Sequence, residues 1–296
     1  MARICVLGGT GFVGQALASR LVTQGHEVRV LTRQRFRHRP LLVLPTLDLV
    51  QANVHKEQSL IRHTEGMDVV INLIGILNES RMRGQSFKKT HVQLAQKLVS
   101  ACHTHKIPRL LQMSALGANR NTRSQYLRSK AEAEAALLQF SGVTQVTCFR
   151  PSLIFGPGDH LIGRFTTLLR LAPYFFPLGC PDTRFAPVYV GDVVTRMCDS
   201  LTDRQTYSQS ISLCGPDIYT LQELVELIAK TADLKRRIAR LSPFLFRMQA
   251  RILGHVPGKP ITMDNYYSLQ VDSVCPDADP CPTHLEPIMR EILKKD

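Results

Sequence analysis

Three side chains have the types and spacing needed for proton transfer beside a hydride donor. Tyr126 and Lys130 are four residues apart, which on a helix places the phenol and the ammonium on one face. The charge of Lys130 is expected to lower the pKa of Tyr126, so that the phenol exchanges a proton with a substrate oxygen. Ser114, twelve residues upstream of the tyrosine, is expected to hydrogen-bond the same oxygen. This pattern predicts acid–base catalysis next to a nicotinamide, with Lys130 also holding the nicotinamide ribose.

A glycine-rich segment near the N-terminus has the spacing of a phosphate-binding turn. Gly8, Gly11 and Gly14 follow the apolar run 3–7 and open a helical pattern. Without Cβ atoms the backbone can approach a pyrophosphate, and the helix start supplies N–H groups and a positive dipole. With a second strand at 27–31, the segment forms a βαβ unit and predicts dinucleotide binding. The alternative is a tight turn without a ligand.

The end of the second predicted strand favours NADP(H) over NAD(H). NAD-specific sites usually carry an acid there that binds the ribose hydroxyls, whereas this chain has Thr32 and Arg33. The guanidinium of Arg33, followed by further arginines at positions 35, 37 and 39, suits a 2′-phosphate. The alternative is a solvated basic loop.

These residues need a sheet that brings strand ends together, and the hydrophobic pattern predicts one. Helical patterns begin at Ser59 and cover 87–105 and 124–140. Apolar runs between them predict strands at 3–7, 27–31, 47–51, 68–74, 109–114 and 145–150. Continuous apolar strands joined by helices indicate an α/β fold, a Rossmann-type doubly wound parallel sheet with helices on both faces.

The alternation breaks at Pro151, after which Pro and Gly become frequent. Two later runs, 188–190 and 211–214, are predicted as strands that return to the sheet, with a helix from Asp192 between them. An amphipathic helix is predicted over 220–232, with a capping box formed by its first residue and Glu223. We predict a dinucleotide-binding domain of residues 1–155 with the returning segment 185–215, and a smaller C-terminal substrate or partner domain of 156–184 and 216–296.

The composition limits the partners of the chain. A net charge of +13, from 37 Lys and Arg against 24 Asp and Glu, suits an anionic partner such as a phosphorylated cofactor, nucleic acid or an anionic membrane surface. Nucleic acid is not expected, because aromatic residues make up 6% and Trp is absent. No window is long and apolar enough for a membrane span and no signal segment follows Met1. A cytoplasmic location is therefore expected, with peripheral association with a membrane as the alternative.

Two further patterns leave alternatives open. The stretch 241–256 mixes apolar residues with Arg247 and Arg251, which fits a partner or membrane surface, or a helix packed on its own core. The eight cysteines are scattered and are expected to be reduced and mostly buried. Cys275 and Cys281 are the alternative pair for a bridge or a metal, and no metal site is predicted.

The glycine spacing, Ser114 and the Tyr-Xaa-Xaa-Xaa-Lys motif, in this order, resemble the extended short-chain dehydrogenases/reductases, which include epimerases and dehydratases. The segment Arg-Pro-Ser-Leu-Ile-Phe-Gly-Pro-Gly-Asp at 150–159 and the segment 184–192 resemble two further motifs of this family. The segments 71–77, 113–118 and 187–190 are more narrowly similar to the subfamily of the nucleotide-binding accessory subunit of respiratory complex I. The resemblance covers nearly the whole chain.

The resemblance implies where a cofactor lies. Asn53 falls where these proteins usually carry an acid near the adenine, and His91 falls where extended members often carry an asparagine. We expect His91 on the surface of its helix. The expected cofactor contacts are Gly8, Thr10, Gly11, Phe12, Val13, Gly14, Thr32, Arg33, Asn53, Leu73, Ile74, Gly75, Tyr126, Lys130, Pro151, Ser152 and Leu153.

Two functional hypotheses follow from the resemblance. The first is an NADP(H)-dependent oxidoreductase, epimerase or dehydratase that acts on an unknown small molecule, such as a nucleotide sugar or another hydroxyl or carbonyl compound. The second is a non-catalytic protein of complex I type, in which NADPH is a structural element and the basic surface meets a respiratory complex or an anionic membrane. Retention of Tyr126 and Lys130 keeps the redox hypothesis open.

Overall fold

The computed structural model describes residues 1–80, 84–140, 142, 144–159, 161–254, 261–276 and 278–295, without the side chains of Arg39 and Lys295. The chain divides into two compact units. The first consists of Met1–Asn121, Leu127–Arg150 and Val193–Ile211, and the second of Thr122–Tyr126, Pro151–Asp192 and Ser212–Asp296. The domain division drawn from the sequence stays a prediction, and its boundaries at 155, 185 and 215 differ from the ends of these units.

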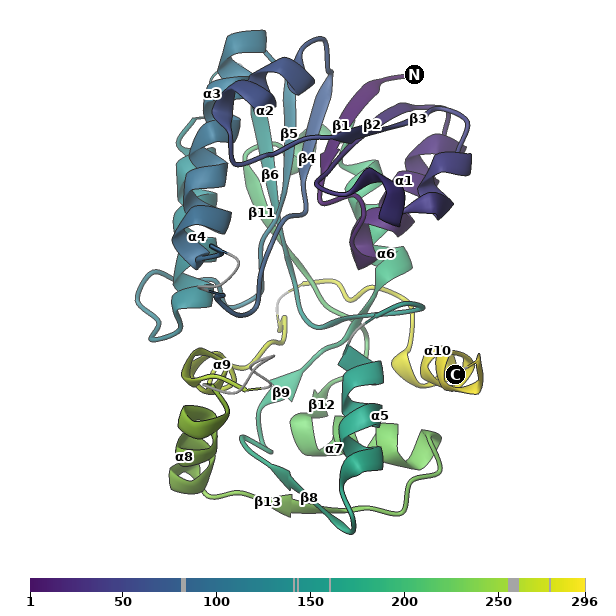
Figure 1. The fold of residues 1–296 in the computed structure, drawn as a ribbon, viewed down its shortest axis with the longest axis vertical. Coiled ribbons are helices and arrows are strands. Elements are labelled where there is room, and N and C mark those ends of the chain that lie inside the picture. Colours follow the sequence, from purple (N-terminus) through teal and green to yellow (C-terminus); the bar gives the residue numbers. More distant parts are fainter. Residues whose placement is uncertain are drawn as a thin grey trace. The chain divides into compact units, whose positions relative to one another are not determined.

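A seven-stranded sheet forms the centre of the first unit (Figure 1). The strand order is β11-β6-β5-β4-β1-β2-β3, and the pairs from β3 to β6 are all parallel. The strands are β1 (Arg3–Leu7), β2 (Glu27–Thr32), β3 (Leu47–Gln51), β4 (Val69–Asn72), β5 (Arg109–Met113), β6 (Gln145–Pro151) and β11 (Gln209–Leu213). The prediction of a doubly wound α/β fold is confirmed. The strand order reverses between β1 and β4, the place where open sheets of this kind bind ligands.

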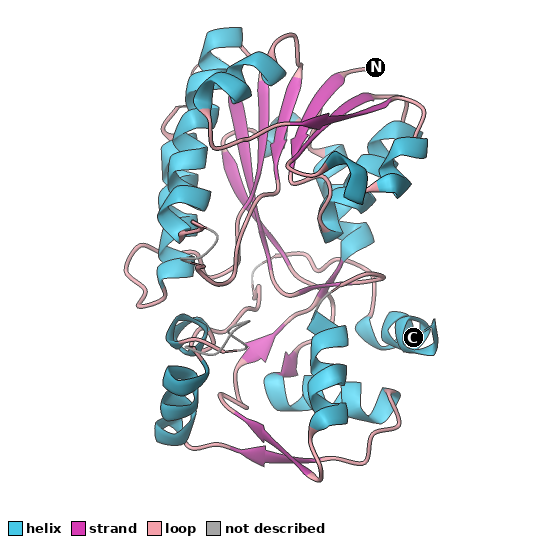
Figure 2. Ribbon diagram, in the orientation of Figure 1, coloured by secondary structure: helices cyan, strands magenta, loops and turns pink. Residues whose placement is uncertain are grey.

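Helices cover both faces of this sheet, as its continuously apolar strands predict (Figures 1 and 2). On one face lie α1 (Phe12–Thr23) and residues 193–199 of α6 (Val190–Asp199). On the other lie α2 (Glu57–Thr64), α3 (Leu94–His105) and α4 (Gln125–Leu138), whose apolar side chains share one core cluster with the strands. A π-helix, Lys88–Gln93, precedes α3, so the helix predicted over 87–105 is not α-helical throughout. Short 3-10 helices lie at Arg35–Arg37, Arg39–Val43 and Arg204–Thr206.

In the part of the second unit that the structure describes, the strands form three small sheets of two strands each. They are β7 (Ile154–Phe155) with β10 (Val188–Tyr189), β9 (Arg184–Phe185) with β12 (Tyr219–Thr220), and β8 (Phe175–Leu178) with β13 (Arg237–Arg240). The prediction that 188–190 returns to the large sheet is wrong, because Val188 pairs with Ile154 instead. The prediction for 211–214 is confirmed by β11.

The described residues of the second unit also form the helices α5 (Leu161–Leu171), α7 (Leu221–Thr231), α8 (Pro243–Leu253), α9 (Met263–Ser268) and α10 (Leu285–Lys295). Side chains of α5, α7 and α10 share one core. The predicted capping box is confirmed, since Thr220 Oγ1 accepts from the N–H of Glu223 and the Glu223 carboxylate accepts from the N–H of Thr220. Residues 255 and 256 of the predicted amphipathic stretch lie outside the described residues. No helix in the described part of the chain is long and apolar enough to cross a membrane.

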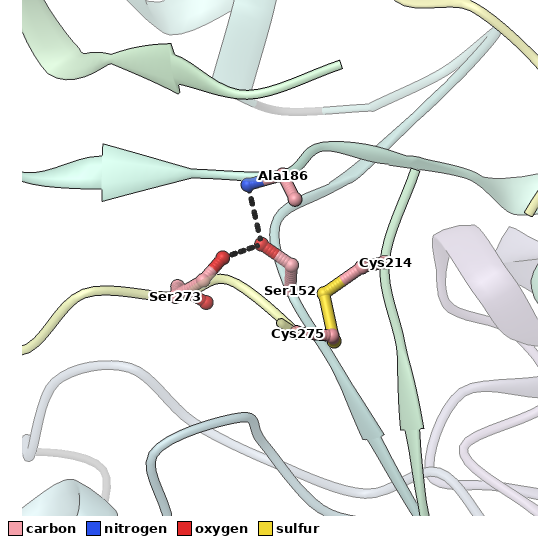
Figure 3. The surroundings of a disulfide bond; sticks show 5 residues. All are labelled: Ser152, Ala186, Cys214, Ser273 and Cys275. Carbon is pink, nitrogen blue, oxygen red and sulfur yellow. Dashed lines mark hydrogen bonds between the residues drawn. A yellow bond between two sulfur atoms is a disulfide. The ribbon is translucent and has the colours of Figure 1, made fainter. Parts of the chain in front are cut away.

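A disulfide in the second unit corrects the cysteine prediction. Cys214, directly after β11, is bonded to Cys275 rather than reduced, and the alternative pairing of Cys275 with Cys281 is wrong (Figure 3). The reason is the path of the chain: the N–H of Cys281 donates to the carbonyl of Cys214 (2.8 Å), so this late segment lies beside the end of β11. Five free thiols are buried, as expected: Cys5, Cys102, Cys148, Cys198 and Cys281.

Candidate dinucleotide site

The glycine turn joins β1 to α1 and leaves the start of the helix open. Gly8 has a φ of +78°, in the left-handed region that favours glycine, and its carbonyl accepts from the N–H of Gly11 (3.0 Å). Gly11 is the N-cap of α1, and no side chain of a described residue caps the helix there. The first turn of α1 contains no acidic residue. Its N–H groups and positive dipole are therefore available to an anion.

Two glycines of the turn meet different requirements. A Cβ at Gly14 would lie 2.3 Å from the carbonyl oxygen of Gly8, so the turn cannot accept a side chain at this position. A Cβ at Gly11 would meet one atom within 4 Å, the Gly8 oxygen at 3.3 Å, apart from its chain neighbours. Packing of the protein thus excludes a side chain at 14, whereas a Cβ at 11 would need a shift of only a few tenths of an ångström. A close approach by a ligand explains a glycine at 11.

A cavity of about 730 Å³ opens at the carboxyl ends of β1, β2 and β4, a volume suited to a small-molecule ligand. It brings together eight of the predicted cofactor contacts: Gly8, Thr10, Gly11, Thr32, Arg33, Leu73, Ile74 and Gly75. Phe12, Val13 and Gly14 form the adjoining first turn of α1. Asn53 lines a neighbouring cavity of about 500 Å³, which shares Arg33 and His55 with the first.

The lining of the larger cavity is basic. It contains Arg33, Arg37, His38 and His55, and none of its described lining residues is an Asp or Glu. Burial lowers the pKa of His55, and the positive charges of Lys89, Lys97 and Arg33 lower it further. Positive potential of this kind favours a ligand with several phosphates. Sequence reasoning missed His38 and His55 as lining residues, although His55 follows the end of a predicted strand.

The side chain of Lys130 reaches the end of β5, where Ser114 directly follows the strand. Lys130 is 4% exposed, and its Nζ donates to the carbonyl of Met113 (3.0 Å). Burial lowers the pKa of Lys130 to about 8. A Cβ on Gly75 would lie 3.2 Å from this Nζ, so the ammonium lies next to a residue of the cavity. Ser114 is 4% exposed, and its Oγ has no hydrogen-bond partner among the described residues. An external oxygen would satisfy this buried hydroxyl.

Tyr126 lies in the first turn of α4, in the part that belongs to the second unit. The carboxylate of Asp264, from α9, accepts from the N–H groups of Gln125 (2.5 Å) and Tyr126 (3.1 Å) and from the hydroxyl of Ser124 (3.0 Å). Burial raises the pKa of Tyr126 to about 12, and the negative charge of Asp264 adds to the rise. The expected lowering by Lys130 is therefore wrong for this structure: the phenol is strongly held in its neutral form.

The other predicted contacts of the second unit take part in its own packing. Ser152 is buried; its Oγ donates to the carbonyl of Ser273 (2.6 Å) and accepts from the N–H of Ala186 (3.3 Å), as Figure 3 shows. Pro151 is buried at the end of β6, and Leu153 packs against the core of the second unit. Their contacts with a cofactor stay a prediction.

His91 is not on a helix surface, as expected from the sequence, but 3% exposed. Its Nε2 accepts from the N–H of Ile76 (3.2 Å), and its Nδ1 lies 2.7 Å from Ser129 Oγ. The neutral ring must therefore carry its hydrogen on Nδ1 and donate it to Ser129. Burial, helped by the charge of Lys130, lowers the pKa of His91 to about 3. The imidazole joins the cavity loop after β4 to the helix turn that carries Lys130.

The sheet order, the glycine turn and a basic cavity at the switch point define a protein of the Rossmann class with a site suited to a nucleotide. Comparison with known proteins makes this more specific. The model of the NAD dependent epimerase/dehydratase family matches residues 4–210, and the chain belongs to this family.

Individual relatives and solved structures agree with this membership. The chain is 32% identical to the mitochondrial NADH dehydrogenase [ubiquinone] 1 alpha subcomplex subunit 9 of Arabidopsis thaliana, over 75% of this chain and 56% of that protein. It is 26% identical to the ceramide reductase of Caulobacter vibrioides, over 80% of this chain and 73% of that protein. The UDP-glucuronic acid 4-epimerase of Bacillus cereus, solved with UDP-glucuronic acid and NAD, has the same fold, with a TM-score of 0.73, 15% identity and 99% coverage of both chains. The chain thus spans little more than half of the first of these relatives.

Proposed function

We propose that the chain binds NADP(H) in the basic cavity and reduces the carbonyl group of a small molecule with it. The observation that carries this proposal is the open start of α1 at Gly11, beside a cavity whose described lining includes arginines and histidines but no carboxylate. The N–H groups of the first turn suit a pyrophosphate. Arg33 and Arg37 suit the 2′-phosphate that distinguishes NADP(H) from NAD(H).

The remaining site residues have complementary roles in this proposal. Asn53 lies toward the adenine, and Lys130, beside Gly75, binds the nicotinamide ribose. The bound nicotinamide supplies the hydride. Tyr126 is neutral below its pKa of about 12, so it can donate a proton to the substrate oxygen. Ser114, whose buried hydroxyl has no described partner, donates a hydrogen bond to the same oxygen. A protonated tyrosine favours the direction of carbonyl reduction.

The substrate class is the least defined part of this proposal. The ceramide reductase of Caulobacter vibrioides and the 2-alkyl-3-oxoalkanoate reductase of Stenotrophomonas maltophilia are both relatives, and both are named as reductases. Nucleotide sugars are the other candidates, since several solved structures of this fold contain them. Either class supplies the oxygen that Ser114 and Tyr126 require.

A second candidate function is a non-catalytic one, in which NADPH stabilises a subunit of a respiratory complex. The 32% identity to a complex I subunit supports it. In this case the cofactor would be held without exchange.

The test begins with the purified protein, from which any nucleotide is released by denaturation and identified by mass spectrometry. Emptied protein is then titrated with NADPH and with NADH. The double variant R33S/R37S should bind NADPH tenfold to a hundredfold more weakly, since a charged hydrogen bond contributes about 1.5–3 kcal/mol, and should bind NADH nearly as before. Arg20→Ser, exposed in the last turn of α1, is the matched control and should change neither affinity.

The outcomes separate the two functions. Exchangeable NADPH together with reduction of carbonyl compounds, abolished in Tyr126→Phe, would support the reductase. Stoichiometric NADPH that resists exchange, without turnover, would support the structural role. No affinity for either dinucleotide would contradict both.

A further inference from the structure

Helix α8 has two apolar faces, and one of them is exposed. Phe246 and Ala250, four residues apart, are buried against α9. Phe244, Met248 and Ile252, also at four-residue spacing, are 73%, 48% and 60% exposed. On a helix these three lie roughly opposite the buried pair and form a continuous stripe. The packing of the second unit therefore accounts for one face of α8 and leaves the other unexplained.

The strand pair β8 and β13 carries a second group of exposed apolar side chains. Leu171, Tyr174 and Phe175, just before and within β8, are 76%, 50% and 55% exposed. Arg237 of β13 pairs with Phe175 in register, and its guanidinium lies 5.5 Å from the centre of the Tyr174 ring. β13 pairs with β8 and leads directly into α8 (Figure 1). The apolar–basic surface, as we call it, consists of Leu171, Tyr174, Phe175, Arg237, Phe244, Leu245, Arg247, Met248, Arg251 and Ile252.

The charged residues in the segment that contains β13 and α8 are all basic. Residues 234–253 contain no Asp or Glu and six basic residues: Lys235, Arg236, Arg237, Arg240, Arg247 and Arg251. Arg247 and Arg251 are four residues apart, on one flank of the apolar stripe of α8. Asp182, from outside this segment, pairs with Arg240. The segment thus has a net positive charge beside large exposed apolar groups.

We propose that the apolar–basic surface binds an anionic lipid membrane, with α8 lying in the plane of the interface. Helices of this kind insert an apolar stripe at the boundary between headgroups and acyl chains, while flanking arginines reach the lipid phosphates. A protein partner would be expected to meet a patch whose core is depleted of charge. Here the charged residues are all basic and lie among exposed Phe, Tyr, Met and Ile side chains. This combination is complementary to a uniformly anionic surface. The proposal does not depend on the cofactor.

Sedimentation with vesicles tests the proposal on the whole protein. Wild type should bind vesicles of phosphatidylglycerol and phosphatidylcholine, should bind pure phosphatidylcholine at least tenfold more weakly, and should dissociate at high salt. The variants F244S/M248S/I252S and R247Q/R251Q should each bind the anionic vesicles at least tenfold more weakly. The control F36S/V43S removes two side chains that are each 80% exposed, beside the arginines of the first unit, and should bind as wild type does. Equal thermal melting of all variants confirms that they fold.

A fluorescent probe gives a second, independent readout. The chain contains no Trp, so Phe244→Trp and the control Phe36→Trp each provide a single reporter. With anionic vesicles the first should shift its emission to the blue and be quenched by brominated lipids, and the second should not. The proposal is wrong if wild type fails to bind anionic vesicles, if the reporter in Phe244→Trp stays in water, or if light scattering shows a dimer that F244S/M248S/I252S converts to a monomer. The last outcome would identify a second copy of the chain as the occupant.

Discussion

The starts of helices α1 and α4 present the same N–H groups and positive dipole, yet the protein treats them in opposite ways. The start of α1 has Gly11 as its N-cap, no side-chain cap among the described residues and no acid in its first turn. The start of α4 is covered by Asp264, whose carboxylate accepts hydrogen bonds from Ser124, Gln125 and Tyr126. One anion-binding position is left to a ligand, and the other is filled by the chain itself.

The difference shows how one element of structure serves two purposes. At α1, glycines keep side chains away from the helix start, so a phosphate can approach it. At α4, an internal carboxylate stabilises the helix turn that carries Tyr126 and raises the pKa of that phenol. The predictions below test whether each start depends on the residues named here.

The largest effect is expected from Gly14→Ala, which tests the packing of the turn. The new Cβ would lie 2.3 Å from the Gly8 oxygen and 2.5 Å from Gly9 Cα, so backbone must move. We expect a loss of about 3 kcal/mol in the free energy of unfolding, the upper range for overpacking. Urea unfolding measures it, and Gly163→Ala, where a Cβ would meet nothing within 4 Å, is the control. An unchanged midpoint would show that the turn relaxes easily.

Gly11→Asp tests the open start of α1 as a ligand site. It fills this position with a carboxylate, as Asp264 does at α4, and repels a pyrophosphate. We expect NADPH to bind about a hundredfold more weakly, which corresponds to about 2.7 kcal/mol. The free energy of unfolding should change much less than in Gly14→Ala, because the Cβ would lie 3.3 Å from the Gly8 oxygen, and a shift of a few tenths of an ångström relieves this contact. Calorimetric titration measures the affinity, and Gly11→Ala should give a smaller loss. Full affinity in Gly11→Asp would place the phosphates elsewhere.

Asp264→Asn tests the covered start of α4. The amide keeps one acceptor but loses the charge, so we expect a loss of about 1–2 kcal/mol in the free energy of unfolding. The pKa of Tyr126 should fall, because the carboxylate raises it in wild type. Urea unfolding and absorbance at the tyrosinate band, each compared with Tyr126→Phe, measure the two effects. Asp182→Asn, which breaks an exposed ion pair with Arg240, is the control and should lose little. Equal losses in both would contradict a capping role.

The same comparison explains how far the sequence predicts this protein. The start of α1 is predictable because strand, glycines and helix are contiguous, and the parallel sheet follows from apolar runs with helices between them. Asp264 is not predictable, because 138 residues separate it from Tyr126. The Cys214–Cys275 bond, 61 residues apart, depends in the same way on the path of the chain. Local patterns in the sequence predict the glycine turn, whereas the contacts that adjust the site come from distant segments.

His91 makes a third long-range contact, and its substitution is expected to change the free energy of unfolding least. Its pKa of about 3 lies below the ordinary 6.5, so the folded protein resists protonation that the unfolded chain accepts. Stability that is present above pH 6.5 is therefore lost as the pH falls toward 3, by about 1 kcal/mol at pH 5.5. In His91→Asn, whose amide can still accept from Ile76 and donate to Ser129, the loss between pH 7 and 5.5 should be smaller by that amount. Urea unfolding at both pH values measures it, with His103→Asn on the exposed side of α3 as control. If wild type and His91→Asn lose equal stability, the imidazole is protonated in the folded protein, and the contact between Ile76 and the turn of Lys130 does not depend on its neutral form.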